Sequence, residues 1–251
     1  MTWLQLTTTP LREIVARDFR AGAILDRYGL DYCCGGALTL GEGCQKRGIS
    51  VERVASDLEA LDPHTREEPE QDPAALIDRI VSRHHAYVRG AMPAIQHHLA
   101  KVVAAHGVHH PELRLVEARF SKLATDLSLH MVKEERVLFP YVRALADAVS
   151  LGAPPPPDMF GTVQNPIRMM EVEHQEAGQD VETIRELTHG YAIPPDACAT
   201  YSVVLRELDA FEKDLHVHVH LENNVLFPKA VELEERAELM ARGLTCGERS
   251  E

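Results

Sequence analysis

Apolar residues recur at helical intervals in four long stretches of this chain. The stretches run over about 72–106, 111–149, 165–190 and 195–236. Alternating runs of β-branched residues, which indicate strands, are few. Four consecutive long helices with short connections predict an all-α protein built on an up-down-up-down four-helix bundle.

Prolines and capping residues mark the ends of these long helices. Asp72 and Asn165 each precede a proline and are expected to cap the first and third helices. Pro93 and Pro140 lie inside helical patterns, where proline removes a backbone hydrogen bond. We therefore expect a local disturbance at each of these two prolines.

Shorter helical patterns precede the bundle. A first helix is predicted from Leu11 to Gly29, with Thr9 as its N-cap and Pro10 in its first position. Further signals are a capping box of Thr39 with Glu42 and a cap at Ser50.

The composition of the segments between these patterns divides the chain. The segment "DPHTREEPEQDP" is polar and interrupted by prolines, as linkers are. We expect a small helical, cysteine-containing domain at 1–61, a linker at 62–72, the bundle at 73–240 and a disordered tail at 241–251.

One short pattern occurs twice in the bundle. "HMVKEERVLFP" begins at His130 and "HVHLENNVLFP" begins at His218. Residues four apart on a helix differ by only ~40° in direction, so His130 shares a face with Glu134, and His218 with Glu222. Apolar neighbours place both faces toward the core; they are Leu123, Leu127, Val137, Leu138, Phe211, Leu215, Val225 and Leu226.

The two glutamates are expected to meet at the bundle axis, because the second and fourth helices lie diagonally opposite. Burying two carboxylates together is unfavourable unless a cation lies between them. Carboxylates with several imidazoles point to iron, with zinc, manganese or cobalt as alternatives. His85 and His174 lie on apolar stripes of the other two helices, and His106 could fold back over the same site. The predicted ligands are His85, His106, His130, Glu134, His174, His218 and Glu222.

A lone histidine on an apolar face is more often a hydrogen-bonded core residue than a metal ligand, and the repeated motif is what favours metal here. Glu135 and Glu173 adjoin ligands but are expected to face elsewhere. The remaining histidines lie off the predicted face or in loops, where most should be solvated; they are His84, His97, His98, His109, His110, His216 and His220.

The charge and the termini narrow the function classes. Lys and Arg number 26 against 39 Asp and Glu, a net charge of −13, which repels a phosphate backbone. No secretory signal or membrane span is apparent, so we expect a cytoplasmic protein with neither nucleic acid nor membrane as a partner.

In a reducing cytoplasm the five cysteines are expected to be reduced thiols. Cys33 and Cys34, in "DYCCGG", are candidates for a thiol relay, with ordinary buried cysteine as the alternative.

These motifs resemble those of the hemerythrin-like di-iron proteins and, more narrowly, of the repair-of-iron-centres family. The resemblance rests on "DYCCGG", "RHH", "AHGVHHPEL", "EVEHQEAG" and the two repeats, and it covers nearly the whole chain. It implies two non-haem iron ions held by the seven residues above, bridged by Glu134 and Glu222 and by an oxo or hydroxo group. It also implies that the small cysteine-containing domain at 1–61 is of the type found at the N-terminus of proteins in this family.

The resemblance further implies repair of iron–sulfur clusters damaged by nitric oxide or oxidants, by supply of iron to the damaged client proteins. A di-iron nitric oxide reductase and a reversible sensor of O2 or NO are the alternatives. Ala177 and Gly178, one turn from His174, suggest room for a diatomic ligand or an exit path. Whether the chain forms a homodimer stays open.

Overall fold

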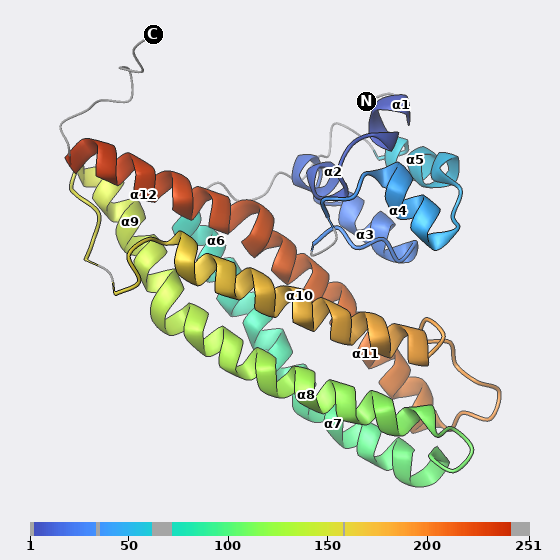
Figure 1. Ribbon diagram of the computed structural model, residues 1–251. Coiled ribbons are helices and arrows are strands. Elements are labelled where there is room, and N and C mark those ends of the chain that lie inside the picture. The colour runs from blue at the N-terminus through green and yellow to red at the C-terminus, as the bar shows by residue number, and fades with distance from the viewer. Residues whose placement is uncertain (1–2, 34–35, 62–71, 158, 242–251) are drawn as a thin grey trace.

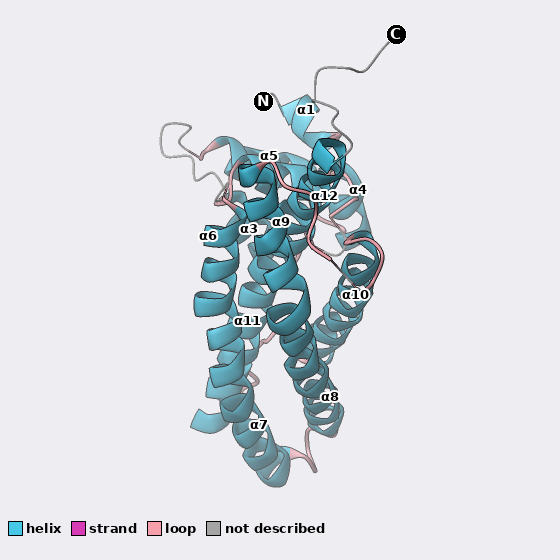
Figure 2. Cartoon of the chain, turned by 90° about the vertical axis from the view of Figure 1, so that its left-hand side faces the viewer, coloured by secondary structure: helices cyan, strands magenta, loops and turns pink. Residues whose placement is uncertain are grey.

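The computed structural model describes residues 3–33, 36–61, 72–157 and 159–241, and every regular element in these ranges is a helix (Figure 1 and Figure 2). Only one isolated bridge, Pro10 to Thr39, has strand-like pairing among them. The all-α prediction is confirmed. The predicted linker and tail lie almost entirely outside the described residues.

The N-terminal unit contains five short helices: α1 (Trp3–Thr7), α2 (Leu11–Arg17), α3 (Ala21–Arg27), α4 (Leu40–Arg47) and α5 (Val51–Glu59). The predicted caps of the last two are confirmed. Thr39 and Glu42 form a reciprocal capping box, and the Ser50 hydroxyl accepts from the backbone N–H of Arg53. These pairs satisfy N–H groups that have no partner within the helix.

The single helix predicted from Leu11 is instead two helices. The carboxylate of Asp18 accepts the backbone N–H of Arg20 and pairs with its guanidinium at 2.6 Å, and this local turn replaces the helix at that point. Thr9 is not an N-cap, because its hydroxyl donates to the carbonyl of Gln5 at 2.6 Å.

Four helical rods form the bundle. They are α6 (Pro73–Arg79), η2 (Ile80–His85) and α7 (Ala86–His106); α8 (Glu112–Lys133), η3 (Glu134–Leu138) and α9 (Phe139–Leu151); α10 (Gln164–Leu187); and α11 (Ala199–Leu221), η4 (Glu222–Leu226) and α12 (Phe227–Ala241). The rods lie side by side along one long axis, and the N-terminal unit packs against one flank (Figure 1). None of the described helices combines the length and apolar character that a membrane crossing requires.

The bundle core has two apolar halves. One half, built on Val88, Phe120 and Phe211, is formed by α7, α8, α10 and α11; the other, which includes Leu145 and Phe227, also contains residues of α6, α9 and α12. All the predicted ligands except His106 fall at or beside the boundary between these halves. A layer of buried polar side chains therefore crosses the bundle between two hydrophobic cores.

Three π-helical turns, η2, η3 and η4, lie at this boundary. η3 and η4 each lie directly ahead of the Phe-Pro pair that ends a repeat, and proline has no N–H to continue an α-helical ladder. The wider turn shifts the helical phase. Val137, expected in the core, is 48% exposed, whereas Val225 at the same place in the second repeat is 6% exposed, and Phe139 points inward at 2%.

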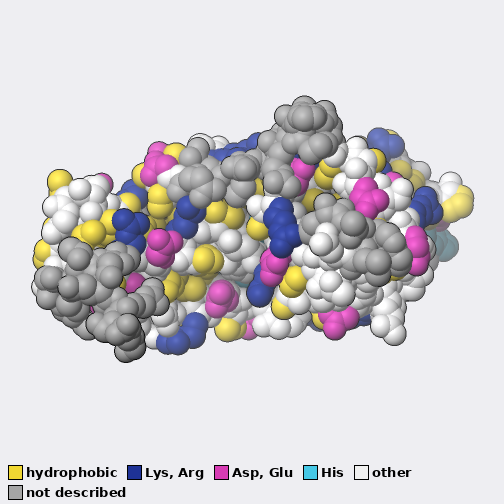
Figure 3. Space-filling model, turned by 90° about the horizontal axis from the view of Figure 1, so that it is seen from above, with side chains coloured by type: hydrophobic (Ala, Val, Ile, Leu, Met, Phe, Trp, Pro, Cys, Tyr) yellow, Lys and Arg dark blue, Asp and Glu magenta, His cyan; other side chains and the backbone are white. Residues whose placement is uncertain are grey.

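The N-terminal unit docks on the bundle through buried polar contacts. Asp26 accepts from His216 Nδ1 at 2.8 Å, and the ring of Tyr32 contacts those of His216 and His220. An ion pair of Arg47 with Glu182 at 3.0 Å adds to this interface. On the surface seen from above, described acidic and basic side chains are interspersed (Figure 3).

Glu234 of α12 anchors the segment that leads into α10. Its buried carboxylate accepts the backbone N–H of Val163 at 2.8 Å, the hydroxyl of Thr162 at 2.7 Å and the phenol of Tyr141 at 3.1 Å. Asn165 is not the cap of α10, because the helix begins one residue earlier and the Asn165 amide donates to the carbonyl of Phe160. One carboxylate therefore joins three segments of the bundle.

We expect Glu234→Ala to lower the free energy of unfolding by roughly 3 kcal/mol, because buried donors lose a charged acceptor. Urea unfolding of the full chain measures the change. Glu235→Ala, at an exposed neighbour, is the matched control and should be nearly neutral. Equal effects of the two variants would contradict the anchoring role.

Candidate metal centre

Six of the seven predicted ligands meet inside the bundle, each with at most 2% of its surface exposed. They form two groups whose ligand atoms lie within 4.8 Å of one another. The first group is His85, Glu134, His218 and Glu222; the second is His130, Glu134, His174 and Glu222. Both glutamates belong to both groups.

Each glutamate turns one oxygen toward each group. In the first group, His85 Nε2 lies 3.4 Å from Glu134 Oε2 and 3.7 Å from Glu222 Oε1. His218 Nε2 lies 3.0 Å from the same Glu222 oxygen and 3.0 Å from His85 Nε2.

The second group repeats this arrangement with the other two oxygens. Glu134 Oε1 lies 3.3 Å from His130 Nε2, Glu222 Oε2 lies 3.2 Å from His174 Nε2, and the two imidazole nitrogens are 2.9 Å apart. The two carboxylates therefore stand between two pairs of imidazoles.

These residues fit a metal ion better than they fit one another. Within the part of the chain that the structure describes, both oxygens of Glu134 and Oε2 of Glu222 are buried without a hydrogen bond, which is unfavourable in an apolar core. Donors bound ~2.1 Å from one ion would lie roughly 3 to 3.5 Å apart, close to the spacings within each group. The donor set suits iron, and the cluster can bind it with nitrogen and oxygen ligands only.

The two buried carboxylates raise the pKa of neighbouring imidazoles. Burial lowers the pKa of His85, but Glu134 and Glu222 outweigh it and raise that pKa to about 10. The pKa of His130 is raised in the same way to about 9, against the effect of its burial. Burial and mutual repulsion raise the pKa of Glu134, yet the imidazoles hold it below its usual value. The pocket therefore favours positive charge.

Outer partners orient three of the four imidazoles. Glu135 bonds His85 Nδ1 at 2.6 Å, and Glu173 bonds His130 Nδ1 at 2.8 Å. Asn223 does the same for His174 Nδ1 at 2.8 Å. Such bonds fix which ring nitrogen is presented to a metal.

Glu135 and Glu173 were expected to face elsewhere, but each carboxylate contacts the Nδ1 of a ligand histidine, a role that helical periodicity does not reveal. The sequence signal that could have indicated this role is that each glutamate is next to a predicted ligand in the chain. His218 differs from the other three, since its buried Nδ1 has no hydrogen-bond partner and its ring stacks on that of His84 at 5.8 Å.

The Val-Leu-Phe-Pro ending of each repeat also serves the site. Phe139 stacks on the ring of His85, and Phe227 stacks on that of His174, with centroids 5.8 and 6.0 Å apart. Each repeat therefore provides a histidine, a glutamate and an aromatic wall for a histidine of another helix. Stacked aromatic contacts of this kind hold rings in place.

The structure does not bring His106 to the cluster. It ends α7, about 30 Å along the helix from His85 at 1.5 Å per residue, and its ring lies 5.3 Å from that of Tyr201. The predicted solvation is wrong for His84, His216 and His220, which are 1%, 8% and 0% exposed. Contacts with Asp214 and with the N-terminal unit bury these three rings.

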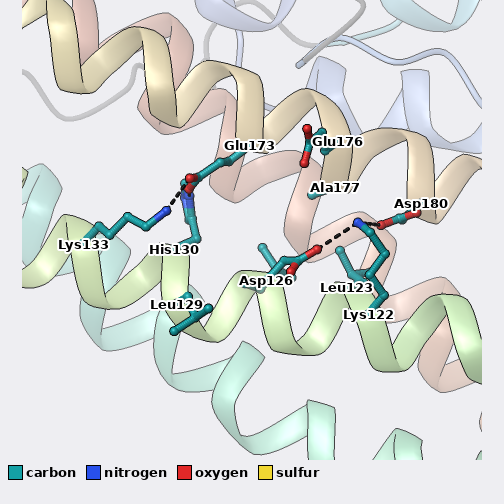
Figure 4. Close-up of a pocket in the computed structure, with 11 residues that line it drawn as sticks. Lys122, Leu123, Asp126, Leu129, His130, Lys133, Glu173, Glu176, Ala177 and Asp180 are labelled. Carbon is teal, nitrogen blue, oxygen red and sulfur yellow. Dashed lines mark hydrogen bonds and ion pairs between the residues drawn. The ribbon is translucent and has the colours of Figure 1, made fainter.

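A cavity of about 200 Å³ between α8 and α10 reaches His130 (Figure 4). Ala177 lines its wall, and Glu173 with Lys133 lies at the His130 end. Lys122, paired with Asp126 and Asp180, lies at the other end. The cavity connects the surroundings of one ligand histidine with the surface.

Of the two candidate cysteines, Cys33 is buried at the contact between the N-terminal unit and the bundle and packs against the first apolar half. Its Sγ donates to Asp31 Oδ1 at 3.1 Å. Cys34 lies outside the described residues. Cys198 is exposed and its sulfur accepts the backbone N–H of Tyr201, capping α11.

Comparison with known proteins agrees with this geometry. Residues 76–230, more than half of the chain, match the family model of the hemerythrin HHE cation binding domain. Residues 7–62 match a model described as a domain of unknown function (DUF542). The fold and site therefore define a hemerythrin-type metal-binding bundle with an additional N-terminal domain.

Curated relatives give a narrower class. A "probable iron-sulfur cluster repair protein" of Haemophilus influenzae is 33% identical over 226 residues, which cover 88% of this chain and 96% of the relative. "Iron-sulfur cluster repair protein YtfE" of Escherichia coli O157:H7 is 33% identical over 224 residues, with the same coverage. The chain belongs to this iron–sulfur cluster repair family.

Replacing both shared carboxylates should empty the centre. We expect Glu134→Ala/Glu222→Ala to lose nearly all bound metal, because the ions would be left with four imidazoles and no anionic ligand. Metal analysis of the purified chain measures this, with Glu171→Ala, an exposed glutamate of α10, as the control. Full metal content in the double variant would contradict the assignment.

Proposed function

We propose that this chain repairs iron–sulfur clusters damaged by nitrosative or oxidative stress, by donating iron held in the bundle. The observation that carries the proposal is the buried pair of carboxylates shared between two pairs of imidazoles. It is supported by two relatives described as iron–sulfur cluster repair proteins, each of which this chain matches over 96% of its length. The clients are then damaged iron–sulfur proteins of the cytoplasm.

The proposed cargo is two non-haem iron ions, one for each group, with Glu134 and Glu222 as shared ligands. Four neutral imidazoles and two carboxylates bring only two negative charges to the pair. Such ligands lose metal when they are protonated, so a centre of this composition can hold iron and still release it. The carboxylates of Glu135 and Glu173 keep the rings oriented for reloading.

The cavity at His130 is the proposed path between the centre and the surface. It is lined by charged groups, including Glu173 and Lys122, which suit the passage of a hydrated ion. The small side chain of Ala177 keeps one wall clear. Cys33 and Cys34 are proposed as thiols that receive iron on its way to a client.

The purified chain should contain two iron ions with the Mössbauer spectrum of a coupled pair, and should transfer iron to an enzyme whose cluster was damaged by nitric oxide. Recovery of the client's activity measures the transfer, and the Glu134→Ala/Glu222→Ala variant should give none. Iron that stays bound while nitric oxide is consumed would favour a reductase instead. A single tightly held zinc ion would overturn the proposal.

Ala177→Leu should slow iron release to a chelator several-fold and leave the iron content unchanged, because the larger side chain narrows the cavity without touching a ligand. Stopped-flow absorption with a ferrous chelator measures the rate. Ala100→Leu, at an exposed position of α7, is the control. An unchanged rate in Ala177→Leu would remove this cavity as the path.

A further inference from the structure

A second group of metal-binding side chains lies where the N-terminal unit meets the bundle. Asp31 and Cys33 come from the N-terminal unit and His216 from α11, and their ligand atoms all lie within 4.8 Å of one another. Cys33 and His216 are 7% and 8% exposed. None of the three belongs to the centre described above.

His216 is held as a metal-binding histidine would be. Its Nδ1 bonds Asp26 Oδ1 at 2.8 Å, and the phenol of Tyr32 donates to the other oxygen of Asp26 at 3.4 Å. A carboxylate on one ring nitrogen fixes the ring and presents the other nitrogen as a ligand. That other nitrogen, Nε2, lies on the side of Glu212, at 3.8 Å from Oε1.

We propose that Asp31, Cys33 and His216 form a second site, which binds one divalent transition-metal ion. A thiolate, an imidazole and a carboxylate suit Fe²⁺, Co²⁺ or Zn²⁺ and do not suit Mg²⁺ or Ca²⁺, which take oxygen ligands. Binding replaces the Cys33 thiol proton, which passes to solvent. Three protein ligands leave a coordination position for water or for a ligand from a client.

The position of this site suits iron in transit. His216 and His218 are two residues apart on α11, so they point to nearly opposite faces and differ by only ~3 Å along the axis. His218 belongs to the bundle centre, whereas His216 borders a surface cavity of about 190 Å³ that Asp31, Gly178 and Glu212 also line. The second site therefore lies outside the helix wall of the centre and is open to solvent.

Ferrous iron is thus the cargo assigned to this second site, and that assignment rests on the proposed function. The coordination site itself does not, because its three ligands are independent of the six in the bundle. Metal binding at the second site and iron transfer to a client can therefore be tested in separate experiments.

The test is a Co²⁺ titration of the reduced, metal-free full chain. Thiolate coordination gives a sulfur-to-cobalt charge-transfer band in the near ultraviolet, which imidazole and carboxylate ligands of the bundle do not give. We expect this band to saturate with one Co²⁺ per chain bound in addition to the ions of the bundle, and to vanish in Cys33→Ser. Asp26→Leu, which removes the acceptor of the His216 Nδ1 hydrogen bond, should lower the affinity of this site for Co²⁺ roughly 10- to 100-fold.

Matched controls separate binding from folding. Cys198→Ser, at an exposed cysteine, and Cys44→Ser, at a buried one in the same unit, should keep the band. The cobalt d–d bands of the bundle should be unchanged in every variant, which shows that the bundle is folded and loaded.

Two results would overturn the second site: absence of the band while the bundle binds cobalt, or its survival in Cys33→Ser. Its loss in Cys34→Ser alone would likewise overturn the assignment to Cys33. Iron transfer then tests the cargo. Transfer at the parent rate by Cys33→Ser would overturn the transit role, whereas failure of the unaltered chain to transfer iron, with the band present, would refute only the proposed function.

Discussion

Two carboxylates that face each other at the axis of a helical bundle set the conditions for the rest of this structure. Glu134 and Glu222 are fully buried, and their mutual repulsion demands compensating positive charge. Four imidazoles surround them, and outer acceptors at Glu135, Glu173 and Asn223 fix three of those rings. The π turns and the two apolar halves of the bundle meet at the layer that contains this pair.

Much of the centre was predictable because it depends on helical periodicity. A histidine and a glutamate four residues apart on an apolar stripe can only point inward, and the repeat identifies two such pairs. His85 and His174 followed from the same argument. The prediction for His106 was wrong because a helix rises 1.5 Å per residue, which places His106 far from the site along the axis. Helical periodicity gives the direction of a side chain and not its position along the axis.

The burial of His216 and His220 depends on a contact between segments almost two hundred residues apart. Asp26 and Tyr32 cover these rings, and no local pattern announces that docking. Caps such as Thr39 and Ser50 were predicted correctly because their chemistry is local. Val137 was assigned to the wrong face, although Val225 at the same place in the second repeat is buried as predicted.

The polar layer between the two apolar halves has a consequence for folding cooperativity. Each half is a contiguous hydrophobic cluster, and every rod of the bundle passes from one half to the other through the ligands. Among the described residues, the layer where the halves meet contains buried carboxylate oxygens that make no hydrogen bond, so we expect the two halves to open more independently when no metal joins them. With metal, both halves share the same cross-links. We therefore expect metal bound in this layer to make the two halves of the bundle unfold as one unit.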